Sequence, residues 1–173
     1  IRSALQQLVY EKLLSQDATG HIYVSTITEK SVQDTSKVRT VLECMAIDSA
    51  VFPLSEAKLQ ELERIDREQH ELIVTHPEDN LRFAELDKEF HCAIAECCDN
   101  ASLIEFIQSI NNVMVRFNVL SGTLPQNRQD ALIEHENIIA FLKKGQREFA
   151  KVALSEHLKH VEERMLSESK KER

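Results

Sequence analysis

Glycine, proline and tryptophan are scarce in this sequence. Its 173 residues include three glycines, three prolines and no tryptophan. Because the turns of β-rich folds draw heavily on glycine and proline, this scarcity argues against such a fold. Leucine, alanine, glutamate, lysine and glutamine, which favour helices, are instead frequent. The composition therefore predicts an all-α protein.

Paired cysteines, long apolar segments and an excess of positive charge are also missing. The cysteines have no CxxC spacing, which indicates reduced thiols in a cytoplasmic protein. No apolar run has the length of a membrane span, and no signal peptide is visible. A net charge of −8 means that the chain as a whole should repel nucleic acid. Because the first residue is Ile1 rather than Met, we expect a fragment of a longer protein.

Apolar residues recur at helical spacing along most of the chain. The pattern predicts a helix over residues 1–14, followed by a turn and one strand within 15–28, with Gly20 at a positive φ. Beyond Thr28 the pattern is helical only. Six further helices are predicted, at about 29–51, from Ser55 to beyond Leu72, from Pro77 to about 98, from Asn100 to about 120, from about 125 to Gly145, and from 146 onward.

A change in composition near Thr28 places a domain boundary at that position. Residues 1–28 would form one unit, and residues 29–173 would form a second, helical one. Helices joined by short connections usually pack as antiparallel neighbours around one core. We therefore expect the second unit to be an antiparallel helical bundle.

Three histidines and one aspartate are predicted to point into the core of this bundle. Asp87 and His91 are four residues apart, so they share one helix face beside the apolar arc. His135 and His157 each fall near the middle of an apolar stripe on a later helix. A single buried histidine is usually satisfied by a carbonyl group or a water molecule. Four inward polar groups on three helices must be paired or coordinated, because burying them otherwise is costly.

Metal coordination would satisfy these four side chains together. Three imidazoles and one carboxylate suit Zn²⁺, Ni²⁺, Mn²⁺ or Co²⁺, and they leave open positions for water or a small organic acid. Arg39 is a candidate to bind the other end of such an acid. The alternative for Arg39 is an ion pair on the helix surface with Glu43, four residues further on. The spacing of these residues alone does not decide between a metal centre and an ordinary polar core.

Several short motifs, taken in order, resemble the FadR-type branch of the GntR family of bacterial transcription regulators. The first is IRSALQQLVYEKLL, which is similar to the end of that family's recognition helix, and SQDATGHIYV resembles the wing that follows. Three further segments resemble the effector (FCD) domain of that family: VRTVLE, ELDKEFHCAIAECCDNASL and EHENIIAFLKKGQREFAKVALSEHL. The resemblance covers nearly the whole chain.

The resemblance implies a bundle of six or seven antiparallel helices, preceded by part of a winged helix-turn-helix domain. It also implies one divalent metal per chain, held by Asp87, His91, His135 and His157. A small carboxylate would be the effector. The expected protein is thus a ligand-responsive regulator, with repression as the expected mode of action.

For DNA binding, the resemblance implies a homodimer on a palindromic operator, with Arg2 of the recognition helix and Gly20 of the wing close to the DNA. Residues 1–28 carry only two basic and two acidic side chains. Thr19 stands where the family often has a basic residue. Because binding to DNA needs several positive contacts, this sequence by itself should bind DNA poorly.

Two other functions remain open from the sequence. A helical metalloenzyme would use metal-bound water and a general base. Glu89 turns to another face, however, and Glu134 and Glu136 flank His135 without a clear inward orientation. A metal-free interaction bundle with an ordinary polar core is the other alternative. The order of the motifs favours the regulator.

Overall fold

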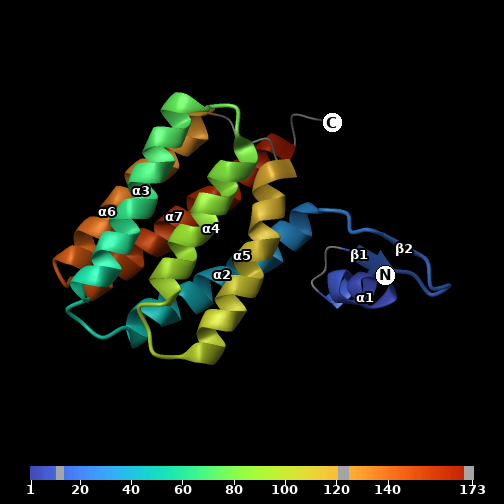
Figure 1. Ribbon diagram of the computed structural model, residues 1–173, viewed down its shortest axis with the longest axis horizontal. Helices are drawn as coiled ribbons and strands as arrows, with labels where there is room; N and C mark the ends of the chain where they lie inside the picture. Colours follow the sequence, from blue (N-terminus) through green and yellow to red (C-terminus); the bar gives the residue numbers. More distant parts are fainter. Residues whose placement is uncertain (11–13, 121–124, 170–173) are drawn as a thin grey trace.

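Seven helices and one two-stranded sheet make up the described part of the chain, residues 1–10, 14–120 and 125–169 of a computed structural model. Helices α2 to α7 form one bundle, and α1 lies with the two strands to one side of it (Figure 1). This confirms the expected all-α fold. In chain order the elements are α1 (Arg2–Tyr10), β1 (Leu14–Gln16), β2 (Ile22–Val24), α2 (Glu29–Ser49), α3 (Glu56–Thr75), α4 (Asn80–Ala95), α5 (Ala101–Leu120), α6 (Pro125–Lys143) and α7 (Arg147–Ser169).

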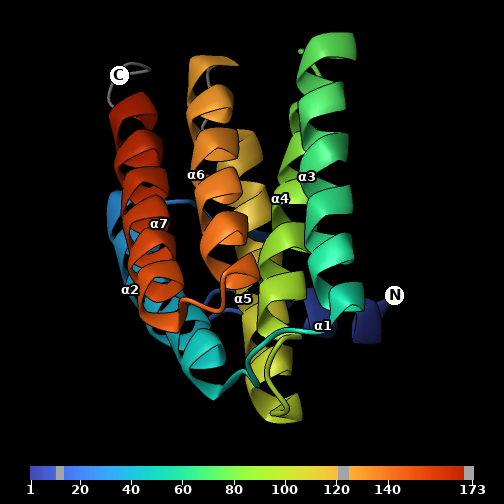
Figure 2. The ribbon, with the colours of Figure 1, turned by 90° about the vertical axis from the view of Figure 1, so that its left-hand side faces the viewer.

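The helices of the bundle are arranged as a closed ring. Helix α2 packs against α5 and α7, α5 packs against α4, α4 against α3, α3 against α6, and α6 against α7. Helix α2 also contacts α4. Figure 2 shows α3, α4, α6 and α7 standing side by side along the length of the bundle. Side chains that point inward from α2, α4, α6 and α7 can therefore meet at one place.

Side-chain caps define where several of the helices begin. The Thr28 and Ser31 side chains form a capping box at the start of α2. The side chains of Ser55 and Asn100 accept backbone N–H groups at the starts of α3 and α5. Gly145, with a φ of 67°, follows the end of α6. These positions match the boundaries predicted from the sequence.

Apolar residues fill the bundle in clusters that lie on either side of a polar centre. The main cluster includes Ile47 of α2, and a second cluster includes Val32 at the other end of the same helix. Arg39 and Glu43 lie between these two residues and are themselves buried. The polar residues are therefore enclosed by the core. The main cluster also contains Leu62, Ile65, Leu86, Phe90, Ile94, Ile138, Leu142, Leu154 and Leu158.

The N-terminal hairpin differs from the prediction. Leu14, expected at the end of the first helix, instead begins β1 and pairs with Val24 of the antiparallel strand β2. The described part of α1 ends at Tyr10. A strand of three residues depends on its partner, so local periodicity does not reveal it. The expected turn residue, Gly20, lies between the strands with a φ of 90°.

The start of α4 also lies later than predicted. The helix begins at Asn80 rather than near Pro77, because the side chain of Asp79 accepts the N–H of Arg82 and caps the first turn. Gly122, which was expected to precede the helix that begins at about residue 125, lies outside the described residues. In the ranges that the structure describes, no helix combines the length and the apolar character needed to cross a membrane.

Candidate metal centre

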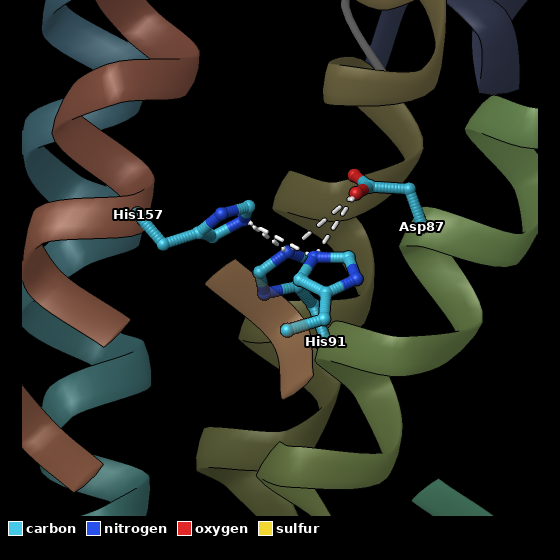
Figure 3. A group of neighbouring side chains, drawn as sticks. Asp87, His91 and His157 are labelled. Carbon is cyan, nitrogen blue, oxygen red and sulfur yellow. Dashed lines mark hydrogen bonds and ion pairs between the residues drawn. The ribbon is translucent and has the colours of Figure 1, made fainter. Parts of the chain in front are cut away.

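The side chains of Asp87, His91, His135 and His157 meet at the polar centre of the bundle. Asp87 and His91 lie on successive turns of α4, and His157 comes from α7 (Figure 3). His135 comes from α6. All four residues are buried. The bundle therefore brings together the whole set of side chains that helical spacing predicted to point inward.

The three imidazole rings present the same nitrogen to a common point. The Nε2 atom of His157 lies 3.2 Å from Nε2 of His91 and 3.3 Å from Nε2 of His135. Oδ1 of Asp87 lies 3.9 Å from Nε2 of His91 and 3.6 Å from Nε2 of His135. Ligand atoms bound at about 2.1 Å to one ion are roughly 3–4 Å apart. The donor atoms are thus spaced as ligands of a single metal ion.

Carboxylates hold the opposite nitrogen in two of the rings. The Nδ1 atom of His91 lies 2.7 Å from Oε2 of Glu43, and Nδ1 of His157 lies 2.7 Å from Oε2 of Glu134. An ionised carboxylate only accepts hydrogen bonds, so Nδ1 must carry the proton in both rings. When such a ring is neutral, the lone pair of its Nε2 faces the centre, which is how carboxylates orient histidines that bind metals.

The third ring is oriented by an amide. Nδ1 of His135 lies 3.1 Å from Oε1 of Gln69, which is fully buried in α3. Burial, followed by the neighbouring histidines, lowers the pKa of His135 well below its ordinary value. Burial also lowers the pKa of His157, although its bond to Glu134 opposes this. Unprotonated Nε2 atoms only 3.2 to 3.3 Å apart would repel one another, and a shared cation would replace that repulsion with bonds.

The carboxylate that orients His91 is itself held by two further groups. Oε1 of Glu43 accepts hydrogen bonds from Nε of Arg39 at 2.7 Å and from Nδ2 of Asn111 at 3.1 Å. Burial opposes ionisation of Glu43, but the charges of Arg39 and His91 hold its pKa at about 2. Glu43 is therefore an ionised carboxylate in the interior. The pairing of Arg39 with Glu43 is as anticipated, but its predicted position on the helix surface is wrong.

Glu134 occupies an equivalent position on the other side of the centre. Besides His157, it accepts hydrogen bonds from Arg164 at 2.8 Å and from Nδ1 of His160 at 2.8 Å. Burial raises the pKa of Glu134, but the bonds from His157 and Arg164 outweigh burial and hold the pKa at about 2. No clear inward orientation was expected for Glu134 from the sequence, but its side chain reaches from α6 to His157 of α7.

Asp87 differs from these two carboxylates because no arginine or lysine in the described part of the chain pairs with it. Among the described residues its only ion-pair partners are His91 and His135. A buried carboxylate without a cationic partner is costly. The donor set of three imidazoles and one unbalanced carboxylate therefore fits a divalent metal ion.

A small pocket lies beside Asp87. It encloses about 30 Å³ and is lined by residues of α4, α5, α6 and α7, including Phe83, Arg128 and Arg164. A space of this size holds about two water molecules, since one water needs roughly 10–15 Å³. Arg39 is not part of its lining.

The sequence did not reveal the residues that orient the histidines. Glu43 had a usable signal, because it lies four residues after Arg39 and four before the buried Ile47. The sequence around Gln69 and Glu134 contains no such signal, because each of them bonds to a histidine on another helix. The two residues expected to lie near DNA are distant from this centre, on the exposed surface of α1 (Arg2) and in the turn between the strands (Gly20).

Sequence comparisons identify the helical part of the chain. Residues 34–160 match the FCD domain family. The uncharacterised HTH-type transcriptional regulator YdhC of Bacillus subtilis is 28% identical over 168 residues, which span 93% of this chain and 75% of the relative. The HTH-type transcriptional repressor RspR of Escherichia coli is 23% identical over 163 residues, which span 94% of this chain and 71% of the relative. Both relatives are transcription regulators, and neither is named as an enzyme.

Solved structures show the same fold. McbR/YncC of E. coli has a TM-score of 0.80 and 21% identity, covering 92% of this chain and 79% of its own. The metal-free FCD domain of TM0439 has a TM-score of 0.66 and 20% identity, covering 85% of this chain and 99% of its own. Together with the match over residues 34–160, these similarities show that the chain belongs to the FadR-type, FCD-domain regulators of the GntR family.

Proposed function

We propose that this regulator responds to a small organic acid through a divalent metal held in its helical domain, residues 29–173. The observation that carries the proposal is the convergence of three buried imidazole nitrogens on the unbalanced carboxylate of Asp87. Binding of the acid would change how the N-terminal unit, residues 1–28 together with the rest of its winged helix, binds operator DNA.

The proposed metal ligands are Asp87, His91, His135 and His157. Their nitrogen and oxygen donors suit Zn²⁺, Ni²⁺, Mn²⁺ or Co²⁺, one ion per chain. A metal bound by four protein ligands in a five- or six-coordinate site supplies a positive charge with open positions that a carboxylate can occupy.

Arg39 is the proposed second contact for the acid. Its side chain is 2% exposed, and Glu43 binds only its Nε atom. Nη1 and Nη2 are buried without a hydrogen-bond partner among the described residues. Leaving such donors unpaired is costly, and a carboxylate would pair with both at once. Arg39 also lies close enough to contribute, after burial and the neighbouring histidines, to the lowered pKa of His135.

Binding of an acid would require the bundle to open. The space beside Asp87 is about 30 Å³, whereas pockets for small molecules usually measure roughly 300–1,000 Å³. Helix α5 offers a connection from the centre to the N-terminal unit: Asn111 bonds to Glu43, and Arg116 donates a hydrogen bond to the carbonyl of Ser25 in the linker. A shift of α5 would therefore move its contact with Glu43 at the centre and its contact with Ser25, next to the N-terminal strands, at the same time.

DNA binding is assigned to the N-terminal unit, through the family and the names of the relatives. Arg2 is exposed on α1, and Gly20 forms the exposed turn of the β-hairpin. We expect the regulator to act in the bacterial cytoplasm as a homodimer on a palindromic operator. In such a dimer, the acid would act by favouring one arrangement of the two DNA-binding units over another.

Elemental analysis tests the metal directly. We expect about one first-row transition metal per chain after expression without added metal and brief dialysis. Chelation should lower the melting temperature, and small carboxylates should raise that of the metal-bound protein, because ligands that bind only the folded state stabilise it. A folded protein that takes up no metal even after reloading would contradict the metal centre.

Arg39→Lys tests the effector contact. Lysine keeps a positive charge near Glu43 but cannot form the paired hydrogen bonds of a guanidinium. We expect an unchanged metal content and an affinity for the acid that is about 10–100-fold weaker, since a charged hydrogen bond contributes roughly 1.5–3 kcal/mol. Isothermal titration with the most stabilising carboxylate measures this. Arg64→Lys, at the half-exposed pair with Glu61, is the control, and unchanged affinity in Arg39→Lys would exclude Arg39 from the site.

A further inference from the structure

A second cluster of metal-ligand side chains lies outside the central site. Asp66 and His70, four residues apart on α3, face Glu136 of α6. The Nε2 atom of His70 lies 3.0 Å from Oε1 of Glu136 and 3.9 Å from Oδ2 of Asp66. One ligand atom from each residue lies within 4.8 Å of the others, so the three side chains can share an ion.

Their polar atoms are poorly satisfied by one another. Oδ1 of Asp66 is buried and has no hydrogen-bond partner within the described chain. Nε2 of His70 is also buried, and its approach to Glu136 lacks the geometry of a hydrogen bond. The Asp66 side chain is only 13% exposed. Burial raises the pKa of Asp66, and the negative charge of Glu136 adds to this rise. A simple ion pair between His70 and Glu136 would leave the Asp66 carboxylate without a partner.

We propose that Asp66, His70 and Glu136 form a second divalent-cation site that ties α3 to α6. One imidazole nitrogen and two carboxylate oxygens suit ions such as Zn²⁺ or Mn²⁺, and water would complete the coordination. The ion would balance the two carboxylates and give the buried Oδ1 of Asp66 a partner. It would bind more weakly than the central ion, because two of its three ligands are about half exposed.

This site adjoins a contact that shapes the central one. Gln69 precedes His70 on α3, and His135 precedes Glu136 on α6. Gln69 bonds to Nδ1 of His135. A cation bound by His70 and Glu136 would therefore hold α3 and α6 together next to the hydrogen bond between Gln69 and His135.

Isothermal titration of the metal-free protein with Zn²⁺ tests the proposal. We expect two equivalents to bind, the second more weakly than the first. Asp66→Asn and Glu136→Gln should each weaken the second equivalent at least tenfold or abolish it, with the first unchanged. His157→Ala should lose the tight equivalent and keep the weaker one, so failure of the central site and failure of this site give different results.

His21→Gln is the matched control for surface binding. His21 also faces an aspartate four residues away, with its Nδ1 atom 3.6 Å from Asp17, but this pair is exposed. Among the described residues, no third ligand converges on it. This variant should keep both equivalents. The proposal is overturned if wild-type protein binds no Zn²⁺, or if every equivalent that it binds survives both Asp66→Asn and Glu136→Gln. Circular dichroism of the metal-free variants verifies that they are folded.

Discussion

His157→Ala should lose the bound metal and much of the thermal stability together. His157 is fully buried, and its Nε2 faces those of both His91 and His135. An ion at 100 times its dissociation constant stabilises the folded state by about 2.7 kcal/mol. For a chain of this size, each kcal/mol shifts the melting temperature by about 2–4 °C. We therefore expect a decrease of roughly 5–10 °C, with further loss from the cavity that the substitution leaves.

His160→Ala provides the matched control, one turn further along α7. His160 contacts the same Glu134 carboxylate, but its side chain is 49% exposed and it is not one of the converging ligands. Elemental analysis measures the metal content, and calorimetry measures the melting temperature. Comparing both with and without chelator separates the effect of losing the metal from the effect of losing side-chain packing. In chelator, wild type and His157→Ala should differ by less than they do with metal. Tight binding of metal in His157→Ala, equal to that of wild type, would remove this residue from the centre.

The limits of the helices were predictable where the determinants are local. Thr28, Ser55 and Asn100 are caps that act within three residues, so the sequence around them is sufficient. Strand β1 was missed because it exists only through pairing with β2, and Leu14 also fits a helical pattern. The start of α4 was misplaced because Asp79, rather than the nearby proline, provides the cap.

The inward placement of Asp87 and the three histidines was also predictable, because helical geometry alone determines which face they share with the apolar residues. Asp87 and His91 follow from their spacing of four, and His135 and His157 from their central place in apolar stripes. The groups behind them were not predictable in the same way. Gln69 and Glu134 lie where two neighbouring helices of the ring meet, so their burial depends on packing between helices that the sequence does not specify.

The structure also shows how charge is distributed around the centre. The carboxylates that orient His91 and His157 are each balanced by an arginine, Glu43 by Arg39 and Glu134 by Arg164. These pairs leave Asp87 as the unbalanced charge among the central residues. The bundle thus keeps two ionised carboxylates in its interior, each paired with an arginine.

Glu43→Gln should weaken both the fold and the metal centre. Glu43 is fully buried and bonds to Arg39, His91 and Asn111. Removing its charge leaves the Arg39 guanidinium uncompensated in the interior, which typically costs about 3–5 kcal/mol. The amide oxygen of glutamine can still accept a hydrogen bond from Nδ1 of His91. A neutral amide, however, raises the basicity of Nε2 less than a carboxylate does. Loss of such an orienting group usually lowers metal affinity about 10–100-fold.

Denaturant unfolding and Zn²⁺ titration measure these two effects, and a double variant separates them. In Arg39→Met/Glu43→Gln the uncompensated guanidinium is gone, so part of the stability should return while the metal affinity stays low. Asp34→Asn, at the exposed pair with Lys30, should change neither quantity.

Acid unfolding of the metal-free protein gives an independent test of Glu43. Its pKa is about 2 in the folded protein, below the ordinary 4.5, so its stabilising contribution is complete above pH 4.5 and is lost as the pH falls toward 2. The free energy of unfolding of Glu43→Gln should therefore decrease less over this interval than that of wild type. Equal decreases, with unchanged metal affinity, would mean that Glu43 only fills space between α2 and α4, and that Arg39 needs no internal counter-charge.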